Sequence, residues 1–155
     1  MHLIGVIAGA LLAGSQPAPA THWAVTQVSE ESAFAVDRGS IQADGRMRLF
    51  DAAVVRMGPQ PFEGERTFDY QIVRFGVDCE ARTVQRLAEA FHAQGEPEPL
   101  AVWELDLEPD DIAPDRSFAK AWALVCAEPE GLIWHVRATA EDLVDLVRGA
   151  PSLID

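Results

Sequence analysis

Alternation of apolar and polar residues dominates the first two-thirds of the chain and predicts β-strands there. Apolar side chains recur at every second position in short stretches that are separated by Gly, Pro, Asp and Ser. This period of two is typical of strands that bury one face. Strands are predicted over residues 23–28, 34–37, 46–57, 68–77, 82–91 and 100–107, and again over residues 132–136.

Turn signals divide these stretches. Asp44-Gly45 is a strong hairpin signal, and the sequence Gly58-Pro59-Gln60-Pro61 predicts the end of the strand before it. An acidic turn is expected over residues 109–114. Residues 82–91 also fit a helix, because Leu87, Ala88 and Phe91 have helical spacing. A strand is favoured there, since the residues before them alternate.

Helices are predicted near the C-terminal end, where apolar residues have helical spacing. A helix is predicted over residues 116–127 with Asp115 as its N-cap. A second helix is predicted over residues 140–148, where Thr139 and Asp142 have the spacing of a capping box. Strands followed by helices indicate an α+β fold. We expect an antiparallel β-sheet of about five to six strands, with one or two C-terminal helices packed on one face.

The first twenty residues have the features of a signal peptide. Residues 3–14 are apolar and uncharged, which is too short for a stable membrane span of about 20 residues and typical of a signal-peptide core. Small residues at Ala18 and Ala20 predict cleavage after Ala20, so that Thr21 becomes the N-terminus. The expected organisation is a signal peptide over 1–20 and a single domain over 21–155. No later stretch predicts a stable membrane span, and the protein is expected in the periplasm or outside the cell.

Two cysteines, Cys79 and Cys126, lie far apart and form no C-x-x-C pair. An even number of cysteines in an exported protein indicates a structural disulfide. The alternative is two unpaired buried thiols, which would be usual in the cytosol. Closing a loop of about 48 residues would stabilise the fold by about 4 kcal/mol in the chain-entropy model.

Charge narrows the classes of partner. The chain has 12 basic and 25 acidic residues, which gives a formal net charge of -13. Such a field repels phosphate backbones and anionic lipid, so neither nucleic acid nor an anionic membrane surface is an expected partner. Cationic partners and metal ions are compatible with it.

Local motifs predict no catalytic residue, metal ligand or cofactor. The four histidines lack zinc-site spacing, and the chain has neither a G-x-S-x-G elbow nor a Gly-rich phosphate loop. Carboxylates cluster between residues 104 and 115, where calcium is one interpretation and a solvated strand and turn is the favoured one. The members of this cluster are Glu104, Asp106, Glu108, Asp110, Asp111 and Asp115.

The four tryptophans, at positions 23, 103, 122 and 134, are the remaining candidates for a site. Such side chains form either an aromatic binding platform or part of the core. Trp23 and Trp103 are the candidate binding aromatics. Trp122 lies one helical turn before Cys126 and is the clearest core candidate.

Several motifs resemble the surface-adhesin protein E family of small secreted bacterial proteins. They include Trp23, the run Phe-Ala-Val-Asp-Arg-Gly-Ser-Ile over residues 34–41, Asp78-Cys79, Trp122 and Val125-Cys126. The resemblance covers about residues 23–127 and implies an antiparallel sheet with a packed helix and a Cys79–Cys126 bridge. Some family members look like adhesins that bind host matrix or plasma proteins. The matched residues are structural, so the resemblance assigns no binding residue.

The expected function is an exported, non-enzymatic binding domain with a protein partner at the cell surface or in the periplasm. The predicted strand and helix over residues 132–149 look like an addition to the family pattern. Two alternatives are a small periplasmic or secreted hydrolase and a structural component of the cell envelope. A deep pocket with converging polar groups would favour the hydrolase, whereas a filled sheet face would favour binding.

Overall fold

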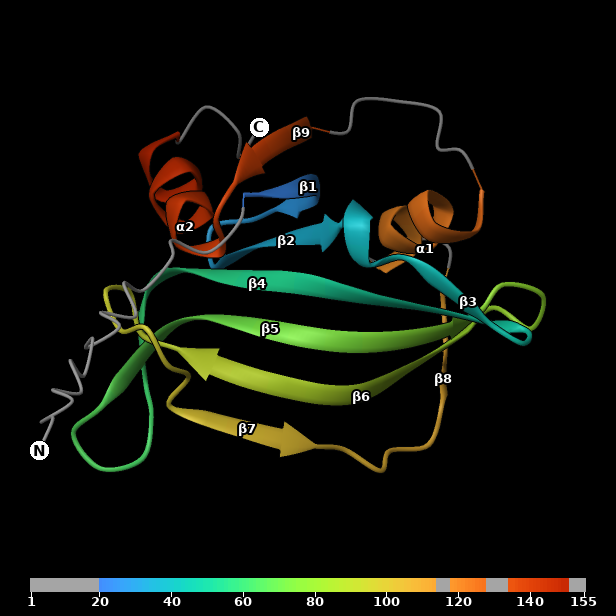
Figure 1. Cartoon of the computed structure of the whole chain (residues 1–155), viewed down its shortest axis with the longest axis horizontal. Coiled ribbons are helices and arrows are strands. Elements are labelled where there is room, and N and C mark those ends of the chain that lie inside the picture. Colours follow the sequence, from blue (N-terminus) through green and yellow to red (C-terminus); the bar gives the residue numbers. More distant parts are fainter. Residues whose placement is uncertain (1–19, 114–117, 128–133, 151–155) are drawn as a thin grey trace, which may run out of the picture.

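One antiparallel sheet organises the described residues, 20–113, 118–127 and 134–150, of this computed structural model (Figure 1). The sheet has nine strands, accompanied by two α-helices and the short 3-10 helix η1 (Arg38–Ser40). The strands are β1 (Thr21–Val28), β2 (Ser32–Asp37), β3 (Gln42–Asp44), β4 (Met47–Pro61), β5 (Thr67–Asp78), β6 (Thr83–His92), β7 (Ala101–Glu104), β8 (Asp110–Asp111) and β9 (Trp134–Ala138). The helices are α1 (Phe118–Cys126) and α2 (Ala140–Gly149).

The main path through the sheet runs β7-β6-β5-β4-β2-β1-β9, while β3 pairs with β4 and β8 pairs with β6. Tight turns join most consecutive strands, so the chain builds the sheet largely from neighbouring hairpins. The hairpin predicted from Asp44-Gly45 is present: Asp44 ends β3 and pairs with Met47, and Gly45 begins the turn with a φ of 59°. A side chain rarely adopts that backbone conformation, so glycine suits the position. In Figure 1, β7 and β9 form the lower and upper edges of the sheet.

The two helices pack against opposite faces of the sheet. Successive side chains along a strand point to opposite faces. On β4, Phe50 and Ala52 belong to the buried cluster that contains Ala121 and Val125 of α1. Ala53 and Val55 of the same strand belong to the cluster with α2. The sheet is therefore the middle layer of the molecule.

Two parts of the predicted architecture are corrected here. The α+β class is confirmed, but the sheet has nine strands rather than five or six. The expectation that helices cover one face is wrong. β4 and β5 carry apolar residues on both faces of the sheet, and each face is buried against one helix.

The strand ends also differ from the prediction. β4 continues through the sequence Gly58-Pro59-Gln60-Pro61 after a register shift between Val55 and Gln60. Prolines are tolerated there, because the register of β4 with β2 extends only to Arg56 and leaves that side unpaired among the described strands. The strand predicted over 100–107 is shorter, and two residues of the predicted acidic turn form β8.

Residues 82–91 were favoured as a strand, and β6 confirms this. The first predicted helix is α1, and its predicted N-cap, Asp115, lies outside the described residues. At α2 the predicted capping box is present. The Thr139 side chain accepts a hydrogen bond from the Asp142 amide, and the Asp142 carboxylate accepts one from Thr139 N.

The C-terminal strand and helix are integral to the sheet and core. β9 pairs with β1 along its length, and the Trp23 indole N–H donates to the Ala138 carbonyl at 3.1 Å. Leu143 and Val144 of α2 are fully buried against the sheet. A segment that looks like an addition in sequence therefore completes one side of the core.

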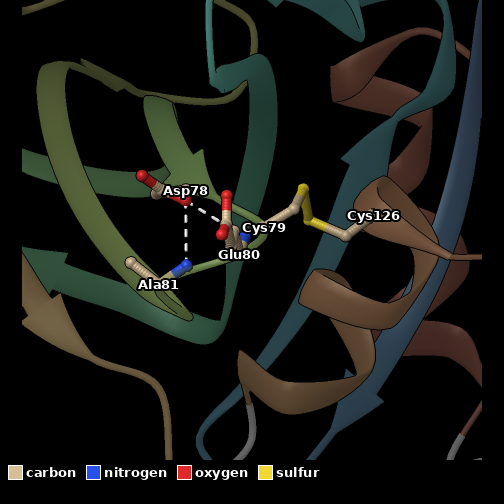
Figure 2. Close-up of a disulfide and its surroundings, with 5 residues drawn as sticks. All are labelled: Asp78, Cys79, Glu80, Ala81 and Cys126. Atoms are coloured by element: carbon tan, nitrogen blue, oxygen red, sulfur yellow. Dashed lines mark hydrogen bonds between the residues drawn. A yellow bond between two sulfur atoms is a disulfide. The ribbon is translucent and has the colours of Figure 1, made fainter.

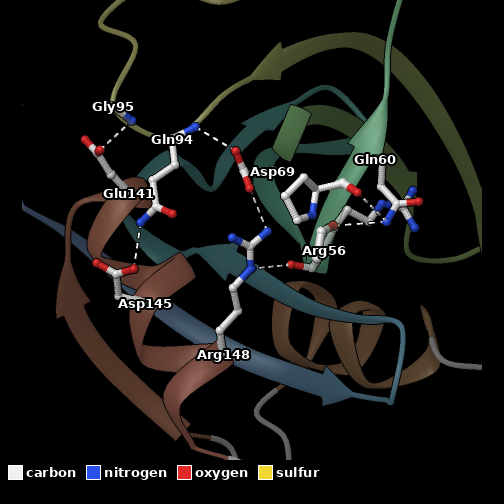
Figure 3. A network of polar contacts seen from close by, with 10 residues as sticks. Arg56, Gln60, Asp69, Gln94, Gly95, Glu141, Asp145 and Arg148 are labelled. Carbon is white, nitrogen blue, oxygen red and sulfur yellow. Dashed lines mark hydrogen bonds and ion pairs between the residues drawn. The ribbon is translucent and has the colours of Figure 1, made fainter. Parts of the chain in front are cut away.

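Polar contacts also hold α2 to the end of the sheet (Figure 3). Arg148 donates to the Arg56 carbonyl at 2.9 Å and to the Asp69 carboxylate at 2.8 Å. The same carboxylate accepts the backbone N–H of Gln94 at 2.8 Å. The Gln94 side chain in turn donates to Asp145 of α2 at 2.7 Å.

The predicted disulfide joins the turn after β5 to the end of α1 (Figure 2). The Cys79 and Cys126 Cα atoms are 5.5 Å apart. The turn itself is fixed by the preceding residue, because the Asp78 carboxylate accepts the backbone N–H groups of Glu80 and Ala81 at 3.0 and 2.9 Å. This bridge anchors the helix that covers one face of the sheet.

Candidate binding surface

Apolar side chains are exposed along the edge strand β7. Val102 is 59% exposed and Trp103 is 42% exposed. β7 pairs only with β6 among the described strands, so its outer backbone groups face away from the sheet. Val102 and Trp103 point to opposite faces of the sheet, since they are consecutive on the strand. We call the two side chains, together with Phe62, Arg66 and Phe91 on the side of Trp103, the β7 edge surface.

Neighbouring rings hold the Trp103 side chain in place. Its ring centroid is 4.7 Å from that of Phe91 and 6.2 Å from that of Phe62, with which it stacks. The sheet register explains the contact: Trp103 lies opposite Glu89 and Ala101 opposite Phe91, so Phe91 and Trp103 are diagonal neighbours on one face. The Arg66 guanidinium lies 5.3 Å from the Phe62 ring centroid. The exposed indole is thus a rigid part of the surface.

Acidic residues are concentrated in the segment that contains β7 and β8. Residues 95–112 contain seven carboxylates and no Lys, Arg or His. All seven are exposed, and none forms an ion pair with another described residue. They are Glu96, Glu98, Glu104, Asp106, Glu108, Asp110 and Asp111. An apolar edge with an acidic border is complementary to a partner that carries apolar and cationic side chains.

These carboxylates face solvent rather than a common centre. Among the described residues, no group of three His, Cys, Asp or Glu side chains is arranged to hold a metal ion. Asp115, the last member of the predicted acidic cluster, lies outside those residues. Oxygen ligands for calcium would have to converge from several directions.

A row of polar side chains lies on the same face as Trp103 and crosses three strands. Glu89 and Gln71 are 8% and 7% exposed. The Gln71 side-chain amide lies between Glu89 and Arg56. It donates a hydrogen bond to Glu89 at 3.5 Å and accepts one from Arg56 at 3.2 Å. Arg86 approaches Glu89 at 3.5 Å from the side. This partnered row separates the β7 edge surface from the apolar residues under α1.

The structure divides the two candidate binding aromatics. Trp23 is only 4% exposed and its indole N–H is bonded to Ala138, so it is a core residue and cannot present its ring. Trp103 is exposed. Trp122 is half-buried, with the Arg82 guanidinium 4.2 Å from its ring centroid. Trp134, 40% exposed, lies at the opposite edge on β9.

Sequence patterns did not single out Phe62 or Phe91. Phe62 lies between the strands predicted over residues 46–57 and 68–77, and Phe91 was assigned only to a strand. They meet because the β4–β5 connection and the β6–β7 register bring distant residues to the same edge, which no local period records. At the predicted cleavage site, Ala20 is exposed and Thr21 begins β1.

Titratable groups with shifted pKa values lie mainly away from this surface. His92 stacks on Tyr70 with centroids 4.7 Å apart. Burial lowers the pKa of His92, which favours the neutral imidazole. The pKa of Tyr70 is raised, first by burial and then by the negative charges of Glu141 and Asp69. Both rings serve packing between the sheet and α2.

Hollows among the described residues are open to solvent. One, of about 380 Å³, is lined by Glu30, Glu31, Arg56, Met57, Gly58 and Gln60. A second, of about 210 Å³, lies between β1 and β9. None of the helices among the described residues is long and apolar enough to cross a membrane.

These features define the class as a small α+β domain with one disulfide and an exposed aromatic edge. The sequence model of the family described as Surface-adhesin protein E matches residues 23–127. The chain belongs to the surface-adhesin protein E family, which confirms the resemblance seen in the sequence. β9 and α2 lie outside the matched range. No curated protein matches the chain.

Solved structures of protein E from Haemophilus influenzae share the fold. Crystal form II is 17% identical, with a TM-score of 0.52 over 65% of this chain and 91% of that chain. A second structure of the H. influenzae protein is 17% identical, with a TM-score of 0.50 over 65% and 87%. Protein E from non-typeable H. influenzae is 16% identical, with a TM-score of 0.50 over 66% and 74%. At such identities the likeness concerns the fold alone.

Proposed function

We propose that this protein is an exported, non-enzymatic, adhesin-like domain that binds a protein partner through the β7 edge surface. Membership of the surface-adhesin protein E family supports a binding role. The observation that carries the proposal is Trp103, an aromatic residue left 42% exposed on an edge strand. Edge strands usually carry protective charges or prolines, and an exposed apolar edge is a recognised interaction site.

The surface also indicates the chemistry of the partner. Tryptophan is enriched among the residues that dominate binding energy at protein interfaces. The surrounding carboxylates attract a cationic partner and repel acidic ones. The partner should therefore offer an apolar contact for Trp103 with lysine or arginine side chains around it.

Replacing Trp103 tests this proposal. The Trp103→Ala variant should bind immobilised extracellular-matrix extract or plasma protein at least about 30-fold more weakly, because central interface tryptophans contribute about 2 kcal/mol or more. Affinity can be measured by surface plasmon resonance with purified protein.

The matched control is Trp134→Ala, which removes a similarly exposed indole from the opposite edge of the sheet. This variant should bind as the unmodified protein does. Equal loss in both variants, or binding that survives the Trp103 change, would refute the assignment of the surface.

Export is the second part of the proposal and has its own test. The signal peptide over 1–20 predicts that protein recovered from its host has an intact mass beginning at Thr21. A full-length mass with two free thiols would place the protein in the cytosol and remove the basis for an adhesin-like role.

A further inference from the structure

The hollow between β1 and β9 has an unusual charge for this molecule. Acidic residues outnumber basic ones by 25 to 12 in the chain, yet none of the described acidic side chains lines this hollow. Its polar lining consists of two arginines and two histidines: His22, Arg38, His135 and Arg137. Trp23 and Val136 complete it. The β7 edge surface lies at the other end of the strand order, so this feature is separate from the proposed function.

Strand register places these side chains on one face. His22 is directly opposite Arg137, and His135 is opposite Ala24, two residues further along β1. Residues two apart on a strand share a face. Because Trp23 is paired with Asp37, Arg38 follows beside His22. Arg38, at the start of η1, thus lies in a row with His22 of β1 and Arg137 of β9.

The two arginines of this row flank His22 and have no acidic partner among the described residues. Within that part of the chain, none of the four side chains forms an ion pair or a side-chain hydrogen bond, and all four are exposed. Their donors are therefore not used by the described part of the fold.

Half of this hollow comes from the segment beyond the family match. His135 and Arg137 lie on β9, outside residues 23–127. The addition therefore brings two further cationic or cation-forming side chains to a site at the edge of the family fold. β9 covers the edge of β1 by backbone pairing alone, and neutral side chains would allow the same pairing.

We propose that this hollow binds a phosphate or sulfate monoester. Arginine guanidinium groups donate in a planar fork that matches tetrahedral oxyanions, and imidazole N–H groups add single donors. A volume of about 210 Å³ leaves room for the oxyanion and part of the sugar or headgroup that carries it. The ligand is a soluble sugar ester or the headgroup of a lipid surface, and these two sources share the recognised group.

The test follows the His22 and His135 ring signals by NMR during titration with glucose 6-phosphate. Chloride at matched ionic strength controls for screening. Both imidazoles should shift in a saturable manner with the ester and not with chloride. In Arg137→Gln the apparent affinity should fall by about tenfold or more, as expected for loss of charge-assisted hydrogen bonds. Arg48→Gln, which removes an exposed arginine from β4, should bind as the unmodified protein does.

Equal shifts with chloride, or unchanged affinity in Arg137→Gln, would overturn the proposal. Vesicles containing phosphatidic acid identify the source: Arg137-dependent binding to them places the ester on a lipid, and binding only to the soluble ester places it on a free sugar. Trp103→Ala should leave all these results unchanged, so the outcome is independent of the partner-binding test.

Stability gives a second readout that a purely structural arginine would not satisfy. Without ester, Arg137→Gln should change Tm by about 2 °C or less, because substitution of an exposed side chain usually changes the free energy of unfolding by about 0.5 kcal/mol or less. With ester present, the unmodified protein should gain Tm and the variant should gain less. An equal gain in Tm for the two proteins on adding ester would overturn the proposal. Arg38→Gln provides the same comparison from η1 if the β9 variant does not fold.

Discussion

Asp78 ends β5 and controls the turn that carries the disulfide. The backbone amide of Ala81 holds the pKa of this carboxyl below its ordinary value, more strongly than burial raises it, and Arg46 and the Glu80 amide act in the same direction. Arg46 approaches the carboxylate at 2.6 Å. The ionised carboxylate is thus the form that the folded turn requires.

This arrangement predicts an acid-dependent loss of stability. A lowered folded-state pKa stabilises the protein above the ordinary aspartate pKa of about 4, and that contribution is lost as pH falls through the lower folded-state value. Urea unfolding should show Asp78→Asn to be less stable than the unmodified protein at pH 7. The difference should shrink towards pH 2. A difference independent of pH would show that the charge of Asp78 does not matter.

A second carboxylate, Asp69, connects the sheet to α2. Asp69→Asn leaves the Arg148 charge, whose side chain is 22% exposed, without its counter-ion. The expected cost is about 2 kcal/mol in the free energy of unfolding, since loss of one member of a largely buried pair is expensive. Glu63→Gln breaks an exposed pair with Arg66 and should cost about 0.5 kcal/mol or less. Equally small losses of stability in Asp69→Asn and Glu63→Gln would mean that the Asp69–Arg148 ion pair in Figure 3 adds nothing to stability.

Single residues also mark where sequence reasoning stopped. Trp23 and Trp103 both lie in stretches of alternating residues, and both were therefore predicted as binding aromatics. One is buried because β9 and α2 cover it, and the other is exposed because β7 is an edge. Position within the sheet depends on long-range pairing, which local periodicity does not encode. For the same reason, the sequence did not predict that Phe62 lies beside Trp103.

At the scale of elements, local signals were sufficient wherever one segment determines its own structure. The Asp44-Gly45 hairpin, the strand character of residues 82–91 and the Thr139 capping box all follow from neighbouring residues, and all are present. The length of β4 was underestimated, because pairing with β5 carries the strand through a Gly- and Pro-containing sequence. The placement of helices on both faces was also missed, because the alternating pattern was interpreted as a sheet with only one buried face.

The C-terminal helix offers the sharpest test at this scale. Leu143 is fully buried in the core that α2 shares with β1 and β4. Leu143→Ala should lower the free energy of unfolding by about 3 kcal/mol, as large-to-small changes in a core do. Leu146 on the same helix is 38% exposed, and Leu146→Ala should cost about 1 kcal/mol or less. Similar small effects for both would mean that α2 is dispensable to the fold.

At the scale of the whole molecule, charge and apolar exposure are distributed unevenly over the sheet. The β7 edge combines an exposed tryptophan with a long acidic border, whereas the β9 edge brings arginine and histidine together. Net charge describes only the average over the chain, and it left cationic partners and metal ions as compatible ligands. It could not show that two ends of one sheet differ in sign, because that difference arises from strand order.

The central claim is that a protein partner binds along β7. Amide hydrogen exchange of the protein, alone and bound to the partner captured from matrix or plasma, tests this claim most directly. The account predicts protection on binding in residues 101–104 and in the segment around Phe62 and Arg66, with no change in residues 134–138. Protection confined to β9, to α1 or to α2 would contradict it.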